Sequence, residues 1–295
     1  MAAQRHVILA LLTFLVQANA LEINVVGGKT GLESDFYCSR SEVSRIDDDI
    51  YWMQALSASA YNFLDKKDSE TTAAYVAWFG ADNAYRTRAE SIMTDVYDSI
   101  WSLGSKSTAY VADLDSSSDA IVIGCADTHT EPLCRTSKAV ASDANGYILL
   151  CPRYFSGANT DYSTAFTYWR SSRTHYITGA EVLLHEMTHL SDVVGSWKTT
   201  DHAYEENQCL ILDDDELIEN ADNFMFFALE VRANRDNAAK QVDMDASERA
   251  YKIARRLLTE GSATGSTSGV TYGSTGGWNY YQSGYPYWRG PWCYT

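Results

Sequence analysis

Apolar residues recur every three or four positions along two early stretches of the chain, as they do on the buried face of an α-helix. The apolar positions are Ile46, Ile50, Met53, Ala60 and Leu64 in the first stretch, and Tyr85, Ala89, Ile92, Val96 and Leu103 in the second. Asp82 precedes the second stretch and is a residue type suited to an N-cap. The pattern therefore predicts two helices at the start of the domain.

The pattern then changes to short runs rich in β-branched and aliphatic residues, at 108–111, 120–123 and 147–150. Polar segments containing glycine and serine separate these runs. The helical period returns at Thr178, and a further helical stretch covers roughly 214–235. Helices, then a small sheet, then helices again predict an α+β domain.

The helix that begins at Thr178 has clear boundary signals. Thr178 and Glu181 have the spacing of a capping box, and Gly195 is suited to end the segment. One face of this helix is apolar, which predicts that it packs on the core. The apolar positions are Leu183, Met187, Leu190 and Val194. Residues 185–189 are therefore expected in the middle of a helix.

The two ends of the chain differ from this domain. Residues 1–20 combine a basic start, an apolar run and a small-residue cleavage pattern, which predicts a secretory signal peptide too short to span a bilayer. Residues 21–37 form an N-terminal segment, 38–260 the domain, and 261–295 a tail rich in Gly, Ser, Tyr and Trp. Contact of this tail with a cell wall or polysaccharide is one interpretation of its aromatic residues.

Charge and cysteine content narrow the class of protein. The net charge of −16 disfavours a nucleic-acid partner, because phosphate backbones are also negative. No other apolar run is long enough for a membrane span, so no membrane partner is expected. Six cysteines without a CxxC pair suggest disulfides in a secreted, extracellular protein rather than a cysteine metal site.

Residues 185–189 read His-Glu-Met-Thr-His, which is the H-E-x-x-H pattern. On a helix, His185 and His189 lie one turn apart on the same face, where two neutral imidazoles can bind Zn²⁺. Glu186 is offset from them and is suited to act as a general base toward water rather than as a ligand. The pattern predicts one catalytic zinc ion.

A catalytic zinc also needs a third protein ligand. Asp192 is seven residues from His185 on the same predicted helix and is too far to share a metal. Position 195 is glycine, which excludes the metzincin spacing. The residues alone leave four candidates after the helix; these are Asp201, His202, Glu205 and Glu206.

Two further segments decide between these candidates by resemblance. The segment 199–204, Thr-Thr-Asp-His-Ala-Tyr, resembles the G-T-x-D-x-x-Y-G motif of the aspzincins, the deuterolysin family of fungal secreted zinc endopeptidases. The segment 220–224, Asn-Ala-Asp-Asn-Phe, followed by Phe227 and Ala228, resembles the N-A-D-N-Y-x-x-F-A segment of that family. Trp78-Phe79-Gly80 and the 148–151 segment also have counterparts, especially in the peptidyl-Lys metallopeptidase branch.

The resemblance implies a zincin-like metalloprotease domain that hydrolyses internal bonds of protein or peptide substrates. It implies that His185, His189 and Asp201 hold zinc, that Glu186 activates water, and that Tyr204 hydrogen-bonds the oxyanion. Asp222 matches an acid that attracts Lys on the primed side of the scissile bond in Lys-specific members. Lys198 and Glu205 stand where the motif has glycines, and Met225 stands where Lys-specific members have a second acid.

The resemblance also implies the disulfides Cys38–Cys125 and Cys134–Cys151, which leaves Cys209 and Cys293 to pair. Two alternative functions remain open at this point. One is a secreted zinc-binding or surface-interaction protein without hydrolytic activity, and the other is a gluzincin that uses Glu205 or Glu206. The presence of Glu186 and Tyr204 argues against a protein that only binds zinc, because binding requires neither.

Overall fold

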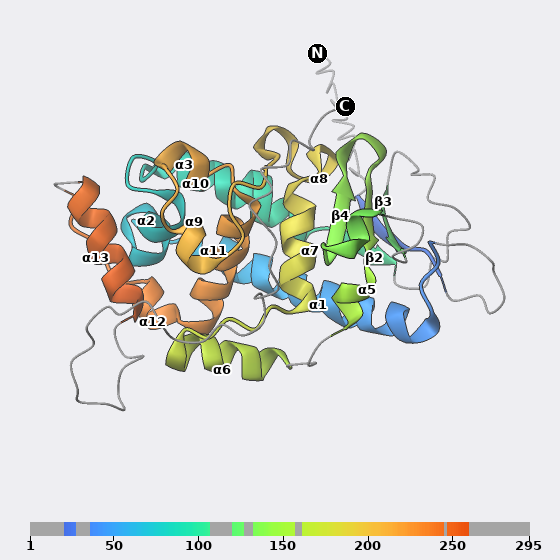
Figure 1. Cartoon of the computed structure of the whole chain (residues 1–295). Helices are drawn as coiled ribbons and strands as arrows, with labels where there is room; N and C mark the ends of the chain where they lie inside the picture. Colours follow the sequence, from blue (N-terminus) through green and yellow to red (C-terminus); the bar gives the residue numbers. More distant parts are fainter. Residues whose placement is uncertain are drawn as a thin grey trace, which may run out of the picture.

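The computed structural model describes residues 21–27, 36–106, 120–126, 132–156, 161–244 and 247–259. The described part is mostly helical, with one small sheet beside the helices (Figure 1). The α+β prediction is thus confirmed. The predicted signal peptide and the C-terminal tail lie outside the described residues, as does the predicted strand at 108–111.

The sheet has five strands in the order β2-β1-β3-β5-β4. Their bounds are β1 Glu22–Val25, β2 Gly104–Lys106, β3 Ala120–Cys125, β4 Ala139–Ser142 and β5 Tyr147–Leu150. All neighbours are parallel except β4 and β5, whose antiparallel register pairs Ala141 with Ile148. The predicted runs at 120–123 and 147–150 fall in β3 and β5. The N-terminal segment 21–37 supplies β1, and β4 lies at one edge of the sheet.

The helices surround a shared aromatic and aliphatic core. They are α1 Arg40–Leu64, α2 Ala73–Phe79, α3 Arg86–Ser91, α4 Ser99–Trp101, α5 Pro152–Phe155, α6 Tyr162–Ser172, α7 Gly179–Thr188, α8 Ser191–Val194, α9 Glu206–Cys209, α10 Asp214–Leu217, α11 Ala221–Ala233, α12 Arg235–Ala238 and α13 Ser247–Thr259. The long helix α1 packs against both α7 and α11. Trp78 stacks on Phe226 with ring centroids 4.9 Å apart, which joins α2 to α11. Among the described residues, none of these helices has the length and apolar character needed to cross a bilayer.

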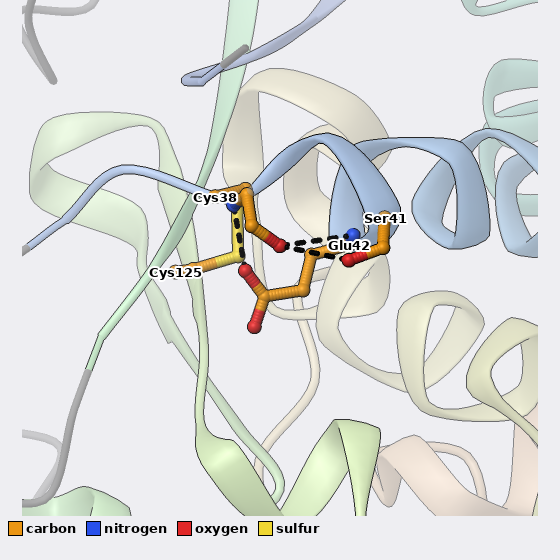
Figure 2. The surroundings of a disulfide bond; sticks show 5 residues. Cys38, Ser41, Glu42 and Cys125 are labelled. Atoms are coloured by element: carbon orange, nitrogen blue, oxygen red, sulfur yellow. Dashed lines mark hydrogen bonds between the residues drawn. A yellow bond between two sulfur atoms is a disulfide. The ribbon is translucent and has the colours of Figure 1, made fainter. Parts of the chain in front are cut away.

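A disulfide holds the start of α1 against the sheet (Figure 2). Cys38 is bonded to Cys125 at the end of β3, and Ser39 begins the helix with a capping box completed by Glu42. The second predicted disulfide, Cys134–Cys151, is also present. Cys209 is buried, and its predicted partner Cys293 lies outside the described residues.

The second predicted helix is divided, and the proposed N-cap at Asp82 is wrong. α3 begins after Tyr85, a π-helical segment follows over Ile92–Asp98, and α4 ends at Trp101 before Leu103. The backbone N–H of Asp82 instead donates to the Asp214 carboxylate at 2.7 Å. Asp82 is thus bonded to α10 and lies before α3 rather than capping it.

The predicted helix over 214–235 is also interrupted. The backbone between α10 and α11 pairs with Thr200, which donates its N–H to Glu219 and accepts from Ala221. Residues bonded in this way cannot continue an α-helix, because their N–H and C=O groups are already used. The interruption ties the 220–223 segment to the loop that contains Asp201.

The helix that contains H-E-x-x-H is shorter than predicted. It begins at the expected capping box, where Thr178 caps Glu181, but ends at Thr188 with His189 as the C-cap. Leu190 is extended, and α8 then runs to Val194 before Gly195. The Thr188 carbonyl accepts from the Thr199 backbone N–H at 2.9 Å, so the chain after α7 folds back on it. The motif therefore occupies the C-terminal end of α7 rather than its middle.

Candidate metal centre and active site

α7 brings the two histidines of the motif together. The Nε2 atoms of His185 and His189 are 3.2 Å apart. The Nδ1 atom of His189 lies 3.1 Å from the Thr199 carbonyl, which can only accept, so that contact places the proton on Nδ1. Nε2 of His189 then keeps its lone pair for a metal ion.

Asp201 completes the group. Its Oδ1 atom lies 3.2 Å from Nε2 of His185 and 3.2 Å from Nε2 of His189. Hydrogen bonds with both imidazoles hold the pKa of the Asp201 carboxyl well below its ordinary value, although burial opposes this. Among the described residues, the side chains placed to share one ion are His185, His189 and Asp201, which we call the metal group.

The three ligand atoms have the spacing of one face of a zinc tetrahedron. Bonds of about 2.0–2.1 Å to tetrahedral zinc place neighbouring ligand atoms about 3.3 Å apart. The three measured separations are all 3.2 Å. Two imidazoles and one carboxylate are also a donor set found at catalytic zinc sites, which leave a fourth position open. The residues therefore fit zinc in both geometry and chemistry.

The Asp201 loop is fixed by contacts from Asn220. The side-chain Oδ1 of Asn220 accepts from the backbone N–H groups of His202 at 2.8 Å and Ala203 at 3.0 Å. Asn220 is fully buried. The sequence indicated this residue only as part of the 220–224 resemblance and assigned it no task, because a contact across eighteen residues leaves no periodic signal.

Glu186 is buried beside the metal group and next to the sheet. The helix α7 packs against β4, the strand that contains Ala141. Burial raises the pKa of the Glu186 carboxyl, while the two histidines of the metal group and the backbone of Ala141 act to lower it. A buried carboxylate with a raised pKa, next to a metal group, suits proton transfer near neutral pH.

Tyr204 lies on the open side of the group. Its hydroxyl donates to Oδ2 of Asp201 at 2.9 Å, and its ring stacks on His185 with centroids 6.1 Å apart. The side chain is exposed, so Tyr204 borders the site rather than filling the core. The structure thus brings Tyr204 to the predicted group of residues.

Asp222 contacts the metal group from behind. Its Oδ1 atom lies 2.6 Å from Nδ1 of His185, and the residue is buried. Asp222 and Asp201 together outweigh the effect of burial and hold the pKa of the His185 imidazole well above its ordinary value. Such a carboxylate orients a histidine ligand and fixes which nitrogen faces the metal. Met225, one turn further along α11, is buried.

The other candidate ligands lie elsewhere. His202 contacts Thr200 through Nε2 at 2.8 Å and has Glu216 and Glu219 at 3.9 Å. Glu206 pairs with Arg173 at 2.5 Å, and Glu205 precedes α9 as its N-cap. Asp192 is exposed on α8. Within the described residues, the group that can share an ion includes none of them.

Comparison with known proteins identifies the family of the chain. Residues 64–229 match the family Aspzincin M35, described as lysine-specific metallo-endopeptidase, and this range includes every residue of the metal group. Among solved structures, the chain is similar to a zinc peptidase from Grifola frondosa, with 22% identity and a TM-score of 0.45 over 66% of this chain and 99% of that one. A search of curated proteins found no match. Since the family match covers more than half of the chain, the protein belongs to the aspzincin family of metallo-endopeptidases.

Proposed function

We propose that the chain is a zinc-dependent endopeptidase in which His185, His189 and Asp201 hold the ion. The observation that carries the proposal is the equal 3.2 Å spacing of the three ligand atoms. When bound, zinc acts as a Lewis acid toward the scissile carbonyl and makes water a nucleophile near neutral pH.

In this proposal Glu186 is the general base and acid. Its buried carboxylate takes the proton of the attacking water and later gives it to the leaving amine. The burial of Glu186 beside the metal group supports this role, because a packed side chain is held close to where the water would be bound.

Tyr204 and Asp222 have supporting tasks. The Tyr204 hydroxyl is anchored near the group by Asp201 and is suited to donate to the oxyanion that develops on the scissile carbonyl. Asp222 orients His185 through Nδ1.

The peptide substrate is expected to lie along β4. This strand is at the edge of the described sheet, and peptides commonly add as a further strand to such an edge. The strand β4 also packs against α7, so a peptide added there would lie near the general base. A preference for Lys on the primed side is the finer part of the proposal, and the family description supports it. The resemblance makes Asp222 its candidate residue, and the contact of Asp222 with His185 would then put the Lys subsite next to the metal group.

Secretion is part of the same proposal. The leader pattern of residues 1–20 and the two disulfides in the described domain support an extracellular location. The protein recovered from an expression medium should then begin at Leu21. Contact of the tail with polysaccharide is a separate proposal, and a pull-down of the secreted protein on insoluble polysaccharide, with and without residues 261–295, tests it.

The activity test uses the purified protein and a denatured protein mixture, with and without a metal chelator. We expect cleavage that the chelator abolishes and that added zinc restores. New N-termini read by mass spectrometry report the specificity, and enrichment of Lys there supports the primed-side preference. Absence of cleavage by a sample with one zinc per chain would instead support the inactive zinc-binding alternative.

Glu186→Gln is the decisive variant. It keeps the size of the side chain but removes its basicity, so we expect activity to fall by about a hundredfold or more while zinc stays bound. Glu90→Gln, which changes an exposed ion pair on α3, is the matched control and should leave activity unchanged. A Glu186→Gln enzyme that cleaves at the normal rate would exclude the mechanism.

A further inference from the structure

Asp143 lies in the turn between the edge strand β4 and β5, in a short 3-10 segment over Asp143–Asn145. Its two carboxylate oxygens contact different partners. Oδ1 accepts from the backbone N–H of Ser191 at 2.5 Å, and Oδ2 accepts from Nζ of Lys198 at 2.9 Å. One side chain therefore contacts two segments that follow α7.

Both partners are close to metal ligands along the chain. Ser191 is the first residue of α8 and stands two positions after His189. Lys198 precedes Thr199, whose carbonyl contacts Nδ1 of His189. Asp201 follows two residues later. Asp143 thus connects the end of β4 to the loop that supplies the third ligand.

The position of Lys198 strengthens the argument. The motif that this loop resembles has glycine there, and glycine has no side chain with which to reach another segment. In this chain the ammonium of Lys198 reaches the β4–β5 turn instead. Lys198 therefore makes a contact between this loop and the β4–β5 turn that a glycine could not make.

We propose that Asp143, with Lys198, is a positioning residue. It holds the proposed peptide-binding edge β4 at a fixed position relative to the loop that contains Asp201. This inference rests on the proposed peptidase function, because it assigns β4 to the substrate. The strand β4 packs against α7, the helix that contains Glu186, so a shift of the β4 turn changes both the peptide edge and the surroundings of the general base. Asp143 does not touch the ligand atoms and acts through the segments that it joins.

A merely structural role would look different. An ion pair with side chains 29% and 46% exposed contributes little to stability by itself. A structural contact alone would lower thermal stability slightly and leave kinetic constants and metal release unchanged. A positioning role changes KM through the peptide edge and kcat through the general base, and it speeds the loss of zinc from the folded enzyme.

The test compares Asp143→Ala, Asp143→Asn and Lys198→Met with the wild-type protein. We expect Asp143→Ala to raise KM for a fluorogenic peptide and to speed zinc release to a chelating dye, each by about tenfold. Asp143→Asn keeps an acceptor for Ser191, and Lys198→Met keeps the Asp143 carboxylate, so both should give smaller changes of the same kind. Glu90→Gln breaks an exposed ion pair away from the site and should change neither quantity.

The outcomes separate this inference from the proposed function. If wild-type protein cleaves peptides but all three variants stay within about twofold of it in KM and zinc release, the positioning role is wrong. If wild-type protein does not cleave at all, the peptidase proposal fails. The zinc-release rates of the variants then still test whether Asp143 and Lys198 hold the Asp201 loop in place. Should Asp143→Ala not fold, Lys198→Met and Asp143→Asn decide the question.

Discussion

Single buried polar side chains determine where the parts of the metal centre lie. Asn220 is the clearest case, since its one oxygen accepts from two successive backbone N–H groups after Asp201. Its amide nitrogen in turn donates to Asn223, which donates to the Trp78 carbonyl in the core. The loop that carries the proposed third ligand is thereby connected to the buried core around Trp78.

Asn220→Ala should therefore weaken metal binding without removing a ligand. The variant leaves the backbone N–H groups of His202 and Ala203 without their acceptor, so the loop loses its fixed position. We expect zinc affinity to fall by about 10- to 100-fold, measured by competition with a chelating dye. The matched control is Asn62→Ala, whose exposed side chain bonds only within α1. Equal affinities for the two variants would contradict this account of Asn220.

The sequence predicted the residues of the site unequally well. The spacing of His185 and His189 determines their geometry on any helix, so their convergence followed from the pattern alone. Asp201 comes from a loop, where no periodicity exists, and its assignment depended on the resemblance. The contact between Asp222 and His185 joins different helices, and no pattern within one segment indicates it.

At the scale of elements, the N-terminus of α7 is held by polar contacts at the end opposite the metal group. Tyr162 accepts from the backbone N–H of Ala180 and donates to the buried Asp49 carboxylate of α1. Gly179 approaches Asp49 so closely that any side chain there would collide with the carboxylate. His175 adds a titratable contact, with Nε2 3.5 Å from the Glu181 carboxylate of the capping box.

The contact of His175 predicts a dependence of stability on pH. Burial lowers the pKa of His175. The negative charges of Glu181, and to a smaller extent of Asp222 and Glu206, outweigh burial and raise the pKa above the ordinary value of 6.5. A raised folded-state pKa means that protonated His175 stabilises the fold below about pH 6.5, and that this contribution is lost as the pH rises through the folded-state value.

His175→Gln removes this titration. We expect the difference in unfolding free energy between wild type and variant, measured in urea with saturating zinc, to shrink as the pH rises from about 6 to about 9. Saturating zinc keeps the metal-binding histidines in one state throughout. A difference that is constant over this range, or that grows with pH, would show that His175 does not act as described.

Some helices were predicted and others were not. α1, α7 and α11 fall in stretches that were expected to be helical, whereas α6 and α13 were not predicted. The start of α3 after Tyr85 and the breaks at His189 and Asn220 were missed. The two breaks coincide with backbone hydrogen bonds to another segment, which no local pattern indicates. The short strands β2 and β4 have three and four residues and offer too little alternation to recognise.

For the whole molecule, the two disulfides differ in how much of the chain they constrain. Cys38–Cys125 closes a separation of 87 residues, and Cys134–Cys151 closes one of 17. A crosslink that closes a longer loop restricts the unfolded chain more.

Replacing each pair by alanine should reveal this difference. We expect a loss of unfolding free energy of about 4–5 kcal/mol for Cys38→Ala/Cys125→Ala and about 3 kcal/mol for Cys134→Ala/Cys151→Ala. Urea unfolding of both double variants provides the comparison. A larger loss from the shorter loop would indicate that native-state packing around Cys134 and Cys151, rather than chain entropy, dominates.

The residues proposed for the chemistry all come from one stretch of the chain. These residues lie within 38 consecutive positions and are His185, Glu186, His189, Asp201, Tyr204, Asn220 and Asp222. The peptide-binding edge and Asp143 come from a separate stretch, 139–146, that precedes it. The two stretches meet only through the fold, so a change in the β4 turn reaches the hydrolytic segment through the contacts of Asp143 with Ser191 and Lys198.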